Sequence, residues 1–334
     1  GMGRPLPVKA SVALAAPKAV KPPRLEKITS VEKNGWRLVP LAGTARSPII
    51  AAPAPGAIDV PVTPSGAWVG FQVAICPPKG VAEKVLVDLR PLWYGRPVEA
   101  MVAPLKHVRV SRGWSVPNAG RNHGDVLVPL GQGQKFSIPW RQNGVAAQKC
   151  QAVFVDIWVP SEAWLGEYKS QLQVMQGDKE IAALPLKINV AGAALSDTFN
   201  IAADMNTYSS PARAMGVNSS DAKAYIAAER KYYRLAHAHR MTLNVLPYSQ
   251  SGSINWRGAP KLTGLWTKCK VSDWSDWDDR YGPLLDGSTF TLKNGYVGPG
   301  PGQPLRHIYL PLHENWPSPL AKSFTPFPPP RDYQ

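Results

Sequence analysis

The stretch VPSEAWLGEYKSQLQVMQGDKEIAALPLKINV, residues 159–190, decides the fold of the first half of the chain. Apolar side chains recur at every second position near its end, at Leu184, Leu186, Ile188 and Val190. This period of two is typical of a half-buried strand. Gly177 and Asp178 supply turn residues between two such segments. The stretch therefore predicts an antiparallel β-hairpin, and the less regular spacing before the turn favours a bulge in the first strand.

Further strand-like segments precede this hairpin. They are AWVGFQVAI (67–75), KVLVDLRPLW (84–93), EAMVAPLKHVRV (99–110), GDVLVPL (124–130) and QAVFVDIWVP (151–160). Turn residues separate them at short, regular intervals, which is typical of an antiparallel sandwich. The chain of 334 residues also contains 35 Pro and 28 Gly, too many for a helical bundle. Residues 66–190 are therefore predicted to form a β-sandwich domain.

Residues 1–65 are rich in Pro, Ala and Lys and are predicted to be a leader and linker, extended and only locally strand-forming. The net charge of +15 is concentrated there, because residues 1–46 hold nine Lys or Arg against two acidic residues. A charge of this size raises nucleic acid as a partner. Since the rest of the chain is only mildly basic, we expect no specific nucleic-acid partner. Nucleic-acid binding through the leader remains an alternative.

Cysteine and acidic residues give little indication of a metal or cofactor. Cys76, Cys150 and Cys269 are widely spaced, without zinc-ligand spacing. A disulfide between Cys76 and Cys150 and three buried thiols are both compatible with the pattern. Five Asp residues lie between positions 273 and 286, but without EF-hand spacing. We expect no metal, no cofactor and, because no long apolar run occurs, no membrane-spanning helix.

The second half of the chain has a different pattern. SSDAKAYIAAERKYYRLAHAHR (219–240) has helical periodicity and begins with Ser220 or Asp221 as a cap. Strand-like segments flank it, so residues 198–248 are predicted to form a βαβ unit of a parallel sheet. A long insertion follows at 249–303, and RHIYLPLHENWPSP (306–319) predicts a third strand.

Polar residues cluster at the expected carboxyl ends of these strands. The first two strands supply Asp204, Asn206 and Asn244, and the third supplies His313, Glu314, Asn315 and Trp316. A carboxylic acid can protonate a glycosidic oxygen, amides and imidazoles bind hydroxyl groups, and an indole stacks on a sugar ring. We therefore predict Glu314 as the catalytic acid and the others as substrate-binding residues. Glu314 bonding backbone donors in its loop is the structural alternative.

Two residues of the insertion complete the predicted substrate site. Trp277, with Trp266, Trp274 and Trp316, could form a saccharide platform, and Asp286 follows the acidic cluster. The alternative for these aromatic side chains is packing of the insertion itself. His237 near the helix end is interpreted as a favourable charge at the helix dipole, and Glu229 as the partner of an arginine.

Three motifs resemble bacterial proteins related to family 123 glycoside hydrolases. They are ERKYYRLAHAHRMTLNVLPY (229–248), RYGPLLDGSTF (280–290) and YLPLHENWPSPL (309–320). The junction from LPLKINV to SDTFNIAADMNTY, within residues 184–208, is also similar. The resemblance covers roughly residues 150–320. It implies an N-terminal β-sandwich followed by a (β/α)8 barrel that acts on glycosides, outside the cytoplasm in the extracellular space, in the periplasm or on the cell surface.

The chain departs from the family pattern in two ways. Characterised members use an adjacent Asp-Glu pair, whereas this sequence contains no Asp-Glu dipeptide. A full barrel also needs about 250 residues, more than follow the junction. We expect a mixed fold, in which the sandwich precedes the first part of an incomplete barrel at 191–334. More polypeptide, from this chain or a second chain, would complete it. The missing pair favours an alternative function, a non-catalytic carbohydrate-binding or scaffold protein.

Overall fold

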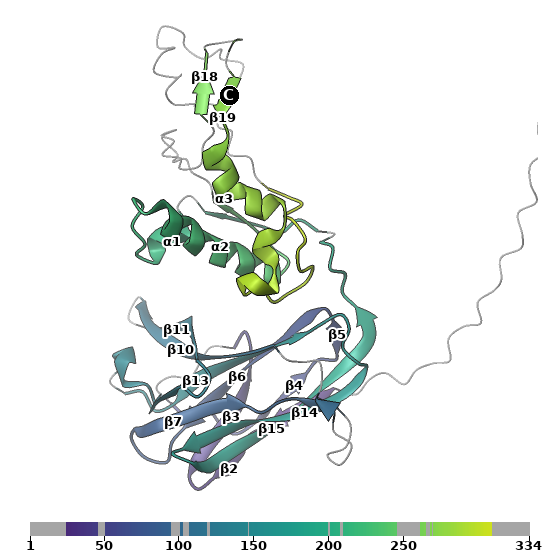
Figure 1. The fold of residues 1–334 in the computed structure, drawn as a ribbon. Helices are drawn as coiled ribbons and strands as arrows, with labels where there is room; N and C mark the ends of the chain where they lie inside the picture. The colour runs from purple at the N-terminus through teal and green to yellow at the C-terminus, as the bar shows by residue number, and fades with distance from the viewer. Residues whose placement is uncertain are drawn as a thin grey trace, which may run out of the picture.

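The computed structural model describes residues 25–45, 51–94, 101–102, 107–118, 121–145, 147–199, 201–207, 210–245, 261–264, 268 and 270–308. It consists mostly of antiparallel and mixed sheets with few helices (Figure 1). The predicted β-rich fold is confirmed at this level.

One sheet of the sandwich has six strands in the order β11-β10-β13-β6-β3-β2. Its strands are β2 (Val31–Lys33), β3 (Trp36–Ala42), β6 (Ala67–Cys76), β10 (Val108–Asn118), β11 (Arg121–Pro129) and β13 (Gln151–Val159). All neighbouring pairs in it are antiparallel.

The second sheet has the order β12-β7-β14-β15-β5; in addition, β8 pairs with β14 and β9 pairs with β8. Its strands are β5 (Thr63–Ser65), β7 (Ala82–Leu89), β8 (Trp93–Tyr94), β9 (Met101–Val102), β12 (Lys135–Ile138), β14 (Gly166–Gln176) and β15 (Lys179–Ala194). The predicted hairpin is β14–β15, with its turn at Gly177–Asp178 and a register shift after Val174. A 3-10 turn, η1 (Arg141–Asn143), follows β12.

Alternate residues of both sheets form the main hydrophobic core. In β6 and β13 the inward-facing positions are taken by β-branched and aromatic side chains, among them Val69, Phe71, Val73, Val153, Val155 and Ile157. In β14 and β15 they include Tyr168, Leu172, Leu184, Leu186 and Ile188, all nearly inaccessible to solvent. Such alternation buries one face of each sheet against the other, as in other sandwiches.

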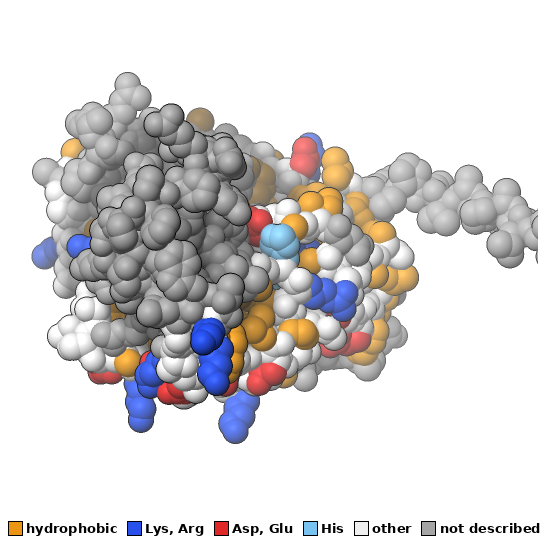
Figure 2. Space-filling view, turned by 90° about the horizontal axis from the view of Figure 1, so that it is seen from above, with side chains coloured by type: hydrophobic (Ala, Val, Ile, Leu, Met, Phe, Trp, Pro, Cys, Tyr) orange, Lys and Arg blue, Asp and Glu red, His pale blue; other side chains and the backbone are white. Residues whose placement is uncertain are grey.

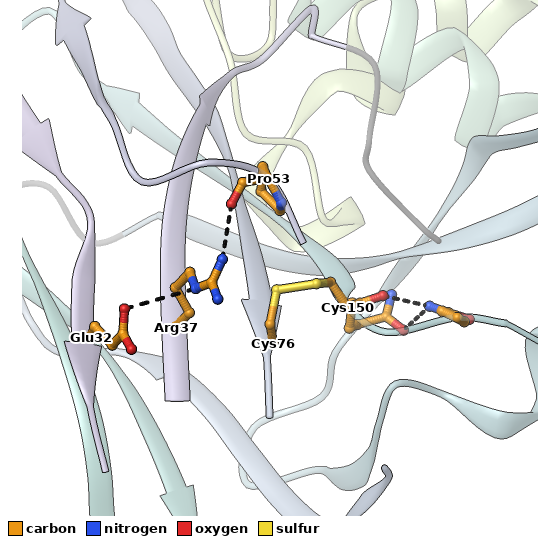
Figure 3. Close-up of a disulfide and its surroundings, with 7 residues drawn as sticks. Glu32, Arg37, Pro53, Cys76 and Cys150 are labelled. Carbon is orange, nitrogen blue, oxygen red and sulfur yellow. Dashed lines mark hydrogen bonds and ion pairs between the residues drawn. A yellow bond between two sulfur atoms is a disulfide. The ribbon is translucent and has the colours of Figure 1, made fainter. Parts of the chain in front are cut away.

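A disulfide joins the two middle strands of the first sheet, β6 and β13, at one end. Cys76 at the end of β6 is bonded to Cys150, which directly precedes β13 (Figure 3). Beside it, Arg37 of β3 donates to the carbonyl oxygen of Pro53 and lies 3.9 Å from a carboxylate oxygen of Glu32. Of the two arrangements that the sequence allowed for these cysteines, the structure therefore has the disulfide.

The predicted leader is too long. Strands β1 (Glu26–Thr29), β2, β3, β4 (Ala57–Val60) and β5 all lie before residue 66. β1 and β4 pair with each other, and Ile28, Trp36, Leu38 and Val60 are part of the sandwich core. The sandwich thus begins by residue 26, although these segments are rich in Pro and Ala.

The second part of the chain contains the predicted βαβ unit. Strand β16 (Asp204–Thr207) leads through α1 (Pro211–Ala214) and α2 (Ala222–Ala238) to β17 (Thr242–Val245), and the two strands pair in parallel. Asp221 caps α2, because its side chain accepts a hydrogen bond of 3.0 Å from Ala224 N. Two parallel strands do not make a barrel, so the barrel remains a prediction, and the expected third strand at 306–319 lies almost wholly outside the described residues.

The insertion has its own structure. Strands β18 (Lys261–Thr263) and β19 (Lys270–Asp273) form a ribbon that leads into α3 (Ser275–Leu285), η3 (Ser288–Phe290) and η4 (Leu292–Asn294). Side chains of α2, β17 and this segment form a smaller core that includes Tyr233, Leu243, Tyr281, Leu284, Phe290 and Tyr296. Much of the described part of the insertion therefore packs around a core that it shares with α2.

Candidate functional site

The β16–β17 pair presents one apolar face and one polar face. Leu243 and Val245 belong to the smaller core. Because side chains alternate along a strand, Thr242 and Asn244 lie on the opposite face. The parallel register places Asp204 beside Thr242 and Asn206 beside Asn244. This polar face is therefore made of one carboxylate, one hydroxyl and two amides.

The two amides of the polar face are bonded to each other. Asn244 Nδ2 donates to Asn206 Oδ1 over 3.1 Å, and Asn244 is buried whereas Asn206 is exposed. The structure thus brings together three of the predicted site residues, Asp204, Asn206 and Asn244. Asp204, however, is the first residue of β16, so it lies at the amino end of its strand and not at the predicted carboxyl end.

A histidine that the sequence analysis did not select joins this face. His307 Nε2 and Asp204 Oδ2 are 3.0 Å apart, and both side chains are partly exposed. His307 comes from the segment that follows η4, more than a hundred residues from Asp204 in sequence. No local pattern marks such a pair, so only the folded structure reveals it.

A cavity of about 270 Å³ borders the same end of the β16–β17 pair. Residues 197–199, 201–202 and 303–307 line it, together with Thr242 at the start of β17 and His237 near the end of α2. Its lining combines apolar and polar side chains, namely Asp197, Thr198, Phe199, Ile201, Ala202, His237, Thr242, Gln303, Pro304, Leu305, Arg306 and His307. His307 therefore lines the cavity and also pairs with the carboxylate of Asp204.

His237 is buried and held by a fixed hydrogen-bond chain. Its Nδ1 lies 2.6 Å from the hydroxyl oxygen of Tyr296, and that hydroxyl donates to the carbonyl oxygen of Pro299. The hydroxyl oxygen must then accept from His237, so the proton is on Nδ1. Burial lowers the pKa of His237 to about 4, and its ring stacks on Phe290 with 4.0 Å between centroids. The expected positive charge at the helix end is therefore wrong: His237 is neutral at pH 7.

Trp277 and Asp286 have structural contacts and do not line the cavity. Trp277 is part of α3, packs against the smaller core and lies 4.5 Å from Tyr281 between ring centroids. Asp286 follows α3, and its Oδ1 accepts from Ser288 N over 2.7 Å, which holds the pKa of its carboxyl below the usual range. Their predicted substrate contacts remain untested.

The predicted catalytic acid Glu314 lies outside the described residues. The same holds for His313, Asn315 and Trp316, so the structure gives no position for the third cluster. Within the described ranges, no three His, Cys, Asp or Glu side chains are arranged to hold a metal ion.

Charge is mixed on the described part of the surface in Figure 2, where Lys and Arg side chains are interspersed with acidic and hydrophobic ones. A field of one sign is the usual mark of a nucleic-acid surface. In the described part of the chain, no helix is both long and apolar enough to cross a membrane.

No family model and no curated protein matches the sequence. Among solved structures, a family 123 glycoside hydrolase from Clostridium perfringens is similar, with a TM-score of 0.48 and 11% identity. The match covers 70% of this chain and 42% of that one, so the chain spans less than half of that structure's length.

Two further solved structures match over about half of this chain. AvmM, which catalyses macrocyclization in alchivemycin A biosynthesis, covers 50% of it with a TM-score of 0.24 and 12% identity. The N-terminal domain of PorA covers 47% with a TM-score of 0.20 and 7% identity. The matches span 97% and 99% of those two chains, respectively. The structural likeness to known proteins is therefore distant.

Proposed function

We propose that this protein is glycoside-hydrolase-like and acts on a poly- or oligosaccharide by acid/base hydrolysis of a glycosidic bond. The observation that carries the proposal is the polar face of the β16–β17 pair. There, an amide pair joins the two parallel strands, and Asp204 at the start of β16 pairs with the imidazole of His307 from the segment after η4. Both pairs contain donors and acceptors that hydroxyl groups can use, and Asp204 and Asn206 are exposed to solvent.

The backbone arrangement supports the same proposal. A parallel βαβ unit directly follows a β-sandwich, in the order that the motif resemblance implies. We propose that β16 and β17 begin a (β/α)8 barrel that further polypeptide completes, from this chain or a second one. In such barrels the substrate binds at the carboxyl ends of the strands, toward which Asn206 and Asn244 lie, whereas Asp204 begins β16. Glu314, in the most specific of the three motifs, is the proposed acid that protonates the leaving oxygen.

Glycan binding by the full chain tests the binding part of the proposal. Asp204→Asn should weaken binding about 10-fold, since a hydrogen bond to a charged group contributes roughly 1.5–3 kcal/mol. Asp178→Asn is the matched control, because Asp178 is an exposed carboxylate in the turn of the β14–β15 hairpin. If no glycan on a broad array binds the wild-type chain, the proposal is wrong.

Turnover separates the enzyme from the alternative, a non-catalytic carbohydrate-binding or scaffold protein. The release of reducing ends from a bound glycan should fall at least 100-fold in Glu314→Gln, a typical loss for removal of a general acid. Binding by the same variant should persist. Glycan binding by the wild type without any release of reducing ends would favour the non-catalytic alternative.

A further inference from the structure

The cavity beside His237 is large enough for more than solvent. The volume available to the centre of a water-sized sphere is about 270 Å³, whereas one water molecule needs roughly 10–15 Å³ of the same measure. Phe199 and Leu305 give it apolar walls, while Thr242, Gln303 and Arg306 add polar groups. A concave site with apolar walls and a few polar groups is the usual form of a small-molecule site.

His237 supplies an unused acceptor at this cavity. Its Nδ1–H is committed to Tyr296, and its Nε2 has no hydrogen-bond partner among the described residues. Only 3% of the residue is exposed, and its ring borders the cavity. Nε2 is not among the described buried polar atoms that lack a partner, so it is not fully shielded, and a ligand in the cavity can donate a hydrogen bond to it.

The neutral state of His237 narrows the ligand class. Burial keeps the ring uncharged at pH 7, so its Nε2 presents a lone pair and not a proton. A lone pair attracts a hydroxyl group and repels an anion. The exposed charged residues at the cavity are of both signs, since Asp197 is negative and Arg306 is positive. They therefore favour a ligand without net charge.

We propose that this cavity is a second ligand site, which binds a small neutral polyol or a single sugar ring through a hydroxyl group that donates to His237 Nε2. The apolar walls at Phe199 and Leu305 would contact the carbon side of the ring. The site lies at the amino end of β17, next to the end of α2, and includes neither Glu314 nor its motif. It does not depend on the proposed hydrolysis.

Titration of the full chain with D-glucose, myo-inositol and inorganic phosphate tests this proposal. We expect D-glucose or myo-inositol to bind and phosphate not to bind. A glycan chain is added as a separate arm, because a chain end and a free monosaccharide present the same hydroxyl groups. If the chain end alone binds, the ligand is a glycan terminus; if the free molecules bind, the site takes soluble polyols.

His237→Phe removes the acceptor while keeping an aromatic ring against Phe290, and should weaken binding about 10-fold. His107→Phe is the control, since His107 belongs to the sandwich segment before β10. Should His237→Phe fail to fold, Ala202→Phe decides instead. It leaves His237 intact, starts from an exposed residue and fills part of the cavity, so it should also reduce binding.

Three results would overturn the proposal. They are no binding of D-glucose, myo-inositol or the glycan chain end at millimolar concentration, binding of phosphate in their place, and equal binding by wild type and the folded variants. If the wild-type chain binds D-glucose or myo-inositol but hydrolyses no glycan, only the proposed function is contradicted.

Discussion

The buried ion pair between α2 and α3 is the strongest test of how the second part of the chain is held together. Arg280 Nε donates to Glu229 Oε2 over 3.0 Å, and its Nη2 donates to Oε1 over 2.6 Å. The two side chains are only 6% and 2% exposed. This two-point contact joins residues 51 positions apart and confirms that Glu229 is the partner of an arginine.

Removing one member of this pair should be far more harmful than removing both. Glu229→Leu leaves a buried guanidinium and Arg280→Met leaves a buried carboxylate, so each should lower the free energy of unfolding by about 3–5 kcal/mol. The double variant leaves neither charge and fills the same space with apolar groups. Its loss should stay within about 2 kcal/mol, because a well-packed hydrophobic replacement is often close to neutral.

Urea unfolding of the full chain at pH 7 measures this difference. Far-UV circular dichroism follows the helices of the second part, and Trp fluorescence follows the whole chain. The control is Arg141→Met, because Arg141 pairs with Glu83 at 3.1 Å but on the surface, with side chains 67% and 54% exposed. That change should cost less than about 1 kcal/mol.

The reasoning would be refuted if each single variant lowered the free energy of unfolding by less than 1 kcal/mol and the double variant lowered it by the sum of the two. In that case the bond would contribute nothing to the packing of α2 against α3. Preserved glycan binding by the double variant would further show that Glu229 acts in structure and not in chemistry.

Three other predictions concern the disulfide, a buried histidine and a loop glycine. Replacing Cys76 and Cys150 by Ala removes a link between residues 74 positions apart and should lower stability by roughly 4 kcal/mol, measured by urea unfolding against the oxidised, disulfide-bonded wild type. Acidification from pH 7 to pH 4 should destabilise the wild type by about 3 kcal/mol more than His237→Phe. The unfolded His237 binds a proton below pH 6.5 and the folded one only near pH 4, so stability is lost as pH falls; equal slopes of stability against pH would contradict this. Gly287→Ala should cost about 2–4 kcal/mol, because φ is +83° and a Cβ would collide with the carbonyl oxygen of Gly302; an unchanged melting temperature would exclude this strain.

Local patterns predicted the hairpin and the βαβ unit because each is defined by residues near in sequence. In β14–β15 the alternation of buried residues and the turn at Gly177 specify the pairing together. In the βαβ unit, Asp221 caps a helix whose ends are set by its own residues. The motif resemblance predicted the order of the parts, and Glu314 lies outside the described residues.

Proline concealed the first strands of the sandwich. β3 contains Pro40, yet β2 pairs only with residues 36–38. Pro40 therefore lies where β3 has a strand on one side only, and proline is tolerated at such a position. The signal that could have revealed β3 is the apolar run around it, including Trp36 and Leu38, both in the core.

Tertiary contacts explain what else the sequence did not show. Helix α3 contains Gly282 and Pro283, both poor helix formers, and is stabilised by burial of Tyr281 and Leu284 and by the Arg280 pair. His237 looked like a charge at a helix end, but Tyr296, 59 residues further on, and burial decide its state. Such partners cannot be found by spacing along one element.

The sandwich holds both sides of the cavity in place through one short stretch of its chain. Ser65 O accepts from Leu195 N over 2.9 Å, which fixes the start of the segment that encloses the cavity. Trp68 Nε1 donates to Ala238 O over 3.0 Å, directly after His237.

Between these two contacts, Gly66 has a φ of +74° and passes so close to Leu195 that a Cβ would lie 2.7 Å from its carbonyl oxygen. Ser65, Gly66 and Trp68 of the sandwich therefore contact the chain on two sides of the cavity, at Leu195 and at Ala238. For this reason the sandwich is part of the proposed ligand site's framework, although none of its strands lines the cavity.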